Sequence, residues 1–138
     1  MEAFTMDMNY KKILVAVDGS FQSKKAVVEA VKVAERNKAL LHVLHVKNKE
    51  RPYENRNLEE QALVIVKEVS DIIDHKVSFE VYQVMGSPKR EIVSFANIEN
   101  CDLVVIGVSG KEIIKRALVG STTLHVLVHA QCDVLVIK

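Results

Sequence analysis

The chain alternates between short apolar runs and longer segments whose apolar residues recur with helical spacing. The short runs are rich in Val, Ile and Leu and predict strands at Lys12–Val17, Ala39–Val46, Val77–Val84, Asp102–Ile106 and Asp133–Ile137. Runs that are apolar at nearly every position are typical of strands buried on both faces of a sheet. The third run differs, because Val77–Val84 alternates apolar and polar residues. That alternation favours a position at an edge of the sheet.

The segments between these runs predict helices. Apolar residues at helical spacing place the helices at Ser23–Lys38, Leu58–Ile73, Pro88–Ile98 and Ser121–Ala130. Pro88 suits the first turn of the third helix, where its missing N–H has no intrahelical partner. A helix after almost every strand indicates parallel strands with helices on both faces. The pattern therefore predicts a Rossmann-like open three-layer α/β sandwich with five strands and four helices, in one domain spanning residues 1–138 with a flexible tail at 1–9.

Composition narrows the class of protein further. The 138 residues carry a formal net charge of +1, only 5% aromatic residues and no Trp, which argues against a nucleic-acid-binding surface. No apolar run reaches the ~18 residues of a membrane span. The first residues include acids where a secretory signal would carry basic residues. We therefore expect a soluble, cytoplasmic protein that binds neither nucleic acid nor membrane.

The cysteines and histidines give no strong chemical signal. Cys101 and Cys132 are each followed by Asp and an apolar run, which predicts small buried residues at two helix-to-strand turns; a redox role is the alternative. His125 and His129 are four residues apart on a predicted helix, but no third ligand accompanies them. We expect a surface or core-edge pair there, and neither a metal site nor a catalytic triad.

The glycines are the most informative residues, because three of the five lie at Gly107, Gly110 and Gly120. Ligands of open α/β sheets bind beyond the carboxyl ends of the strands, and Gly107 is the first residue after a predicted strand. Glycine there would permit positive φ and let a ligand approach main-chain N–H groups. Gly120 precedes a helix whose first turn offers unpaired N–H groups and a suitable N-cap in Ser121. A phosphate site is one interpretation, and ordinary turn and capping residues are the other.

The spacing Gly107-x2-Gly110-x9-Gly120-Ser121 resembles the ATP-binding signature of the universal stress protein family. The resemblance runs in register from about Tyr10 to Lys138, through "YKKILVAVDGS", "LLHVLHV" and "MGSPKREIVSFANIENCDLVVIG". It implies strands in the order 3-2-1-4-5. It also implies a crevice between the first and fourth strands, where ATP would bind.

The resemblance further implies a nucleotide site built from residues that end strands or begin the last helix, namely Asp18, Val46, Ile106, Gly107, Gly110, Gly120, Ser121 and Thr122. Asp18 would contact the nucleoside and Val46 the adenine. The first two glycines would pass under the ribose and phosphates, and the last three residues would hold the phosphates. Mg²⁺ or Mn²⁺ would accompany ATP, bound mainly by phosphate oxygens and water. Many nucleotide-binding members carry Ser with a basic residue or His between the first two glycines, whereas this chain has Val108-Ser109, so weaker phosphate contacts are expected.

These observations predict an ATP-binding stress-response protein that forms a homodimer through its last strand, Asp133–Lys138. No general base stands out that would activate water, so we expect a binding protein rather than an enzyme, with slow hydrolysis left open. The first alternative is a module of the same family that dimerises without nucleotide. The second is an adenylate-transferring enzyme, for which "DGSFQS" is a poor pyrophosphate loop. A response-regulator receiver is excluded, because "VDGS" offers one acid where two are needed.

Overall fold

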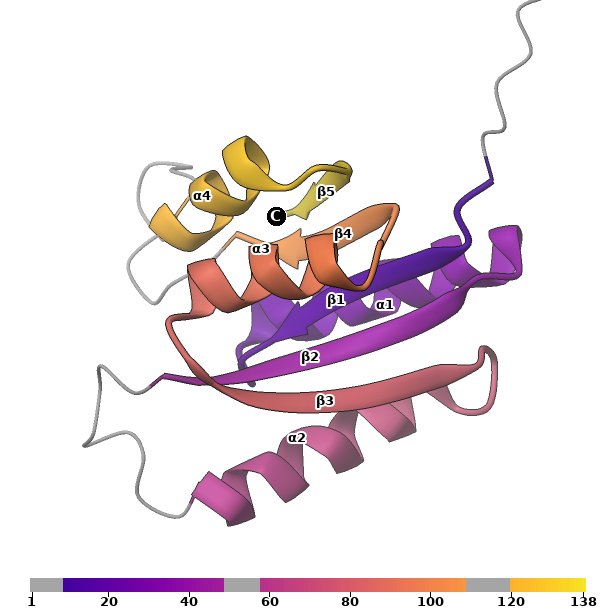
Figure 1. The fold of residues 1–138 in the computed structure, drawn as a ribbon. Coiled ribbons are helices and arrows are strands. Elements are labelled where there is room, and N and C mark those ends of the chain that lie inside the picture. The colour runs from indigo at the N-terminus through magenta and orange to yellow at the C-terminus, as the bar shows by residue number, and fades with distance from the viewer. Residues whose placement is uncertain (1–8, 49–57, 109–119) are drawn as a thin grey trace, which may run out of the picture.

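The computed structural model describes residues 9–48, 58–108 and 120–138, and strands and helices alternate along the chain as predicted (Figure 1). The elements are β1 (Lys12–Val17), α1 (Phe21–Asn37), β2 (Leu40–Asn48), α2 (Leu58–Ile73), β3 (Phe79–Gly86), α3 (Pro88–Ile98), β4 (Leu103–Gly107), α4 (Ser121–His129) and β5 (Asp133–Ile137). Apart from Asn9, the predicted N-terminal tail lies outside the described residues.

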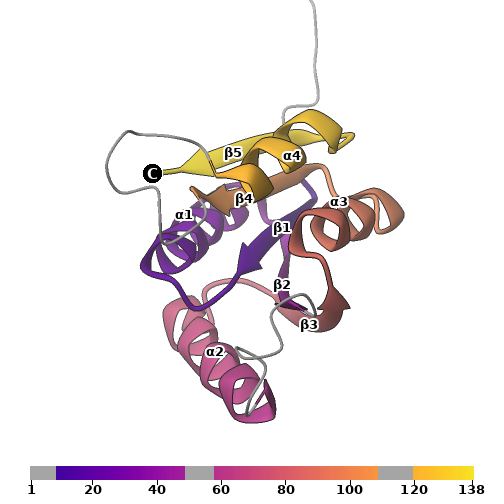
Figure 2. The ribbon, with the colours of Figure 1, turned by 90° about the vertical axis from the view of Figure 1, so that its left-hand side faces the viewer.

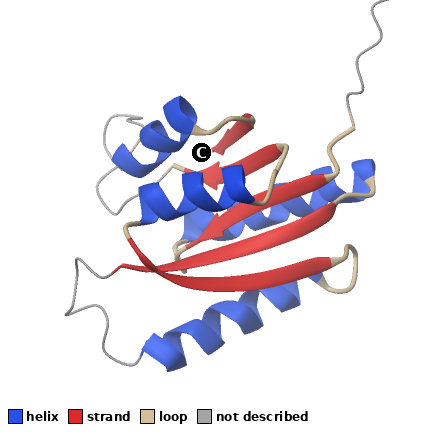
Figure 3. Ribbon diagram, viewed as in Figure 1, coloured by secondary structure: helices blue, strands red, loops and turns tan. Residues whose placement is uncertain are grey.

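The strands form one parallel sheet in the order β3-β2-β1-β4-β5, which confirms the expected order. α1 and α2 cover one face and α3 and α4 cover the other, so the molecule has three layers (Figure 3). The chain crosses from the β3 edge back to β4, on the far side of β1. The direction of winding therefore reverses between β1 and β4, whose carboxyl ends lie side by side. Such a reversal is where ligands bind in open α/β sheets.

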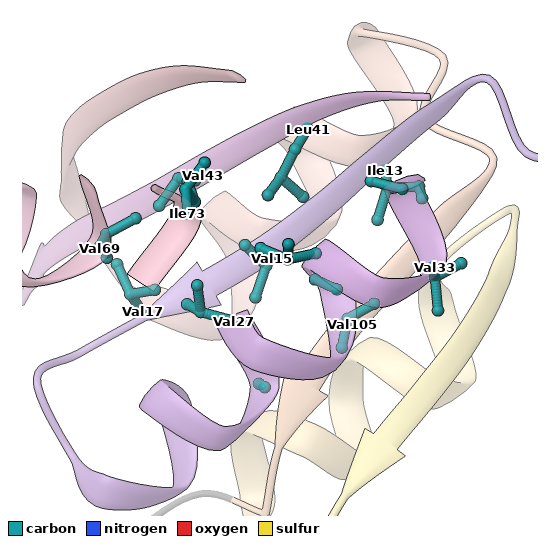
Figure 4. Packing of buried hydrophobic residues seen from close by; sticks show 14 of the residues in the cluster. Ile13, Val15, Val17, Val27, Val33, Leu41, Val43, Val69, Ile73 and Val105 are labelled. Atoms are coloured by element: carbon teal, nitrogen blue, oxygen red, sulfur yellow. The ribbon is translucent and has the colours of Figure 1, made fainter. Parts of the chain in front are cut away.

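The apolar runs of the sequence are explained by two hydrophobic clusters, one on each face of the sheet. Ile13 and Val15 of β1 pack toward α1 and α2 (Figure 4), whereas Leu14 packs toward α3 and α4. All three are fully buried, and burying each such side chain contributes about 1.5–3 kcal/mol. Among the described strands β3 pairs with β2 only, and exposed residues alternate with half-buried ones along most of its length.

Two buried histidines on β2 were not expected from the sequence. His42 and His45 are 3% and 7% exposed. Both ring nitrogens of His42 and the Nδ1 of His45 have no hydrogen-bond partner among the described residues. The ring of His42 stacks on Tyr82, with centroids 5.3 Å apart. Burial lowers the pKa of both histidines, and the nearby Lys12 lowers that of His42 further.

We expect the free energy of unfolding to fall as the pH is lowered below about 6.5, the pKa of an unfolded histidine. The folded pKa values lie below this, so the stability from neutral histidines is complete above it and is lost as the pH falls through the folded pKa values. Guanidinium unfolding at pH 7.5, 6.5, 5.5 and 5.0 measures the effect. His42→Phe should flatten this dependence, and the exposed-site control His75→Asn should not. A guanidinium unfolding midpoint that stays the same from pH 7.5 to 5.0 would contradict the prediction.

Candidate functional site

The turn after β1 is held by its own side chains. Asp18 Oδ1 accepts a hydrogen bond of 2.8 Å from the N–H of Ser20. Ser20 is the N-cap of α1, and its Oγ accepts from the N–H of Ser23 at 3.1 Å. Gly19 between them has φ +82°, a conformation that favours glycine. Asp18 therefore stabilises this turn, and its exposed carboxylate also lies at the carboxyl edge of the sheet.

Gly107 ends β4, and its lack of a side chain is required by packing. A Cβ at this position would lie 2.7 Å from the backbone oxygen of Gln22 and 2.8 Å from its carbonyl carbon. The first turn of α1 therefore rests directly on the end of β4. Gly107 does not use the positive φ that glycine permits, because among the described glycines only Gly19 has it. Ile106, the residue before, is buried beneath α3 and α4.

α4 begins without a side-chain cap. Its N-cap is Gly120, with φ −63° and ψ 161°, and Ser121 is the first helical residue rather than the expected N-cap. The first intrahelical bond runs from the N–H of Leu124 to the carbonyl oxygen of Gly120, at 2.9 Å. The N–H groups that precede it have no intrahelical acceptor, and they carry the positive end of the helix dipole. Ser121 is exposed and Thr122 is half-buried, so this turn can present donors to an anion.

The start of α4 is tied to the end of β4 by Thr123. This side chain is fully buried, and its Oγ1 donates a hydrogen bond of 3.0 Å to the carbonyl oxygen of Gly107. Thr123 was not among the residues that the sequence predicted for the site. It is the third of three consecutive hydroxyl residues, Ser121-Thr122-Thr123, and the one of them that is buried. The bond brings together the two predicted ligand elements, the end of β4 and the uncapped start of α4.

The remaining described residues of the predicted site lie along the same carboxyl edge of the sheet, which faces the viewer in Figure 2. Val46 is half-buried near the carboxyl end of β2, on the side covered by α3. Val17 pairs with His45, so Asp18 is level with Val46 on the neighbouring strand. Gly110 lies outside the described residues. The structure thus places the described part of the predicted set at the ends of β2, β1 and β4 and at the start of α4.

Neither cysteine is suited to thiolate chemistry. Burial raises the pKa of Cys101 to about 11, and burial together with Asp133 raises that of Cys132.

His125 and His129 stack with ring centroids 4.1 Å apart, and the Nδ1 of His129 lies 2.9 Å from the carbonyl oxygen of His125. Within the described ranges, no three His, Cys, Asp or Glu side chains are grouped for metal binding. No described helix is long and apolar enough to cross a membrane.

Comparison with known proteins decides the family. The family model described as the universal stress protein family matches residues 9–138. The chain belongs to the universal stress protein family. A putative universal stress protein of Staphylococcus aureus (strain USA300) is 36% identical to it over 144 residues, which cover 95% of this chain and 86% of the relative.

Solved universal stress proteins share the fold. The universal stress protein UspA from Lactobacillus plantarum superposes with a TM-score of 0.82 at 30% identity, covering 96% of this chain and 100% of that protein. A universal stress protein in complex with cAMP superposes with a TM-score of 0.73 at 26% identity, covering 94% of this chain and 98% of that protein. The expected family and the strand order 3-2-1-4-5 are therefore confirmed.

Proposed function

We propose that this universal stress protein binds ATP at the carboxyl edge of its sheet, between β1 and β4. One observation carries the proposal: the bond from Thr123 to Gly107 holds the uncapped start of α4 beside the point where the winding reverses. Open amides and a positive helix end at that point suit a phosphate chain. The complex of a related universal stress protein with cAMP supports an adenine nucleotide as the ligand class.

Four of the predicted residues, Asp18, Val46, Ser121 and Thr122, lie where their predicted roles are possible. One carboxylate oxygen of Asp18 accepts from Ser20, and the other remains for the hydroxyls of the ribose. Val46 offers an apolar contact for the adenine at the end of β2. The N–H groups and hydroxyls of Ser121 and Thr122 would bind the phosphates. The described edge has no cluster of metal ligands, so Mg²⁺ or Mn²⁺ would be bound by phosphate oxygens and water.

The protein would act by binding rather than by catalysis. The described residues at the ends of β1 and β4 and at the start of α4 offer amides, hydroxyls and one carboxylate. One oxygen of that carboxylate accepts from Ser20 and the other is proposed to bind the ribose, so neither is assigned to a general base. Bound nucleotide instead stabilises the folded protein relative to the unfolded chain. We propose that this linkage serves a stress response in the cytoplasm.

We further propose a homodimer formed through Asp133–Lys138. β5 pairs with β4 along one edge, and no described strand pairs with its other edge. Leu124, Leu127 and Val128 lie on one side of the neighbouring α4 and are 52%, 48% and 66% exposed, and Leu135 of β5 is 37% exposed. Apolar side chains gathered beside an open strand edge favour association with a second copy.

Thermal melting with and without Mg·ATP tests the nucleotide proposal. At a hundred times its Kd, ligand should add about 2.7 kcal/mol, or roughly 2–8 °C in Tm for a domain of this size. Gly120→Val should abolish the shift, because its side chain would cover the first N–H groups of α4. Gly110→Val should do the same if that residue passes under the phosphates. Sedimentation of the same samples should show a dimer.

No shift at millimolar ATP would favour the alternative module that binds no nucleotide. One observation favours that alternative, since packing against Gln22 accounts for Gly107 without a ligand. A normal shift in both glycine variants would show that the phosphates lie elsewhere. Incubating ATP with candidate acceptors tests the adenylate-transferring alternative, which predicts a covalent adenylate.

A further inference from the structure

The outer edge of β3 is unpaired along its full length within the described part of the chain. It pairs in parallel with β2 from Leu41 and Phe79 to Asn48 and Gly86, and no described strand pairs with its other side (Figure 1). The backbone N–H and C=O groups on that side are therefore available to an added strand. Added strands of this kind are a common mode of peptide recognition, in which backbone bonds supply affinity and neighbouring pockets supply specificity.

A hollow of about 200 Å³ lies where β3 meets α3. It is lined by Val84, Glu91, Ser94, Phe95, Ile98 and Glu99. Ile98 is 72% exposed, so a large apolar side chain of this hollow is accessible to solvent. The volume is below the roughly 300–1,000 Å³ of typical small-molecule pockets. A single long side chain suits it better than a nucleotide does.

The hollow is acidic as well as apolar. Glu91 and Glu99 line it, and Glu80 lies on the same face of β3 as Val84. None of these three carboxylates forms an ion pair within the described part of the chain. The ammonium group of Lys12 donates to the backbone oxygen of Glu99, at 2.9 Å, and the carboxylate of Glu80 accepts from the hydroxyl of Tyr82. Carboxylates that have no ion-pair partner, beside an aromatic ring and aliphatic side chains, complement a Lys or Arg side chain.

We propose that the open edge of β3 and this hollow together bind an extended, basic peptide segment of a partner protein. The segment pairs with β3 as a sixth strand. One of its Lys or Arg side chains enters the hollow, with its aliphatic part against Phe95 and Ile98 and its charge near Glu91 and Glu99. β2 and β1 separate this surface from the β4 end of the nucleotide site, whereas Val46, the proposed adenine contact, pairs with Val84 at the hollow. Peptide binding uses the edge of β3 and the carboxylates of α3, none of which has a role in the proposed nucleotide site, so it does not require bound nucleotide.

Fluorescence anisotropy with labelled octapeptides tests the proposal on the full chain. The probe is Thr-Val-Arg-Val-Ser-Val-Arg-Thr, compared with the same peptide carrying Glu for Arg. Two further peptides are N-methylated at alternate residues, one in each register, so that one of them cannot pair with β3. The Arg peptide should bind at least tenfold more tightly than the Glu peptide and than one of the N-methylated peptides. Equal affinities for all four peptides would overturn the proposal.

Variants locate the binding surface. Glu91→Gln and Glu99→Gln keep the side-chain shape and should each weaken binding of the Arg peptide three- to tenfold. Ile98→Ser changes an exposed side chain and should weaken it similarly. Glu59→Gln, an exposed acid on α2, is the matched control and should leave it unchanged. Unchanged affinity in all three hollow variants would overturn the proposal.

NMR amide shifts and melting separate this site from the nucleotide site. Adding the Arg peptide should shift amide signals of β3 and α3, and shifts confined to other elements would overturn the proposal. The Tm shift produced by Mg·ATP should be the same in Glu91→Gln as in the natural sequence. Loss of that shift in Glu91→Gln would show that one surface serves both ligands, and would overturn the separate site.

Discussion

Gly107→Val is expected to lower the free energy of unfolding by about 3 kcal/mol or more, at the upper end of the usual cost of overpacking. The added Cβ alone would lie 2.7 Å from the backbone oxygen of Gln22. A flexible side chain could move away, but this neighbour belongs to the first turn of α1. Relief therefore requires α1 to move away from β4. Urea unfolding followed by circular dichroism measures the loss.

A graded series separates this contact from a general effect of removing glycine. Gly107→Ala should already destabilise the protein, and Gly107→Val should destabilise it more. Gly120→Ala is the control, since φ −63° and ψ 161° suit alanine, and its cost should stay within about 1 kcal/mol. Equal stability of Gly107→Ala and the natural sequence would show that α1 does not rest on β4 as described.

Thr123→Val is expected to lower the free energy of unfolding by about 1–3 kcal/mol. Valine keeps the shape of threonine but removes the donor to Gly107, and the carbonyl oxygen of Gly107 then loses its bond at a buried position. The same variant should reduce the Tm shift produced by Mg·ATP, because the start of α4 is no longer tied to the end of β4. Urea unfolding and melting with nucleotide measure the two effects.

Thr122→Val is the matched comparison. Its side chain is half-buried and lies next to Thr123, so little loss of stability is expected, within about 0.5 kcal/mol as at most surface positions. Its hydroxyl is proposed to bind phosphate, so the ATP shift should fall. Full stability in Thr123→Val would refute the structural role of the buried hydroxyl. A normal ATP shift in both variants would argue against phosphates at the start of α4.

The sequence by itself determined the elements and the class of fold. The bounds of β1, β5, α2 and α3 agree with the apolar patterns, and the other elements differ by one or two residues at their ends. These patterns are local, because a strand buried on both faces is apolar throughout and Pro88 marks the first turn of a helix. The resemblance carried by the glycine spacing led to the family and to the strand order, and both are confirmed.

The tertiary structure alone decided how the site is held together and where the second surface lies. Gly107 is glycine because Gln22 packs on it, and Thr123 bonds Gly107 across a segment that includes Gly110. The hollow forms between β3 and α3. In each case the contacting residues belong to different segments of the chain and meet only after the sheet has assembled. The pattern of one segment therefore cannot predict which residue of another segment will contact it.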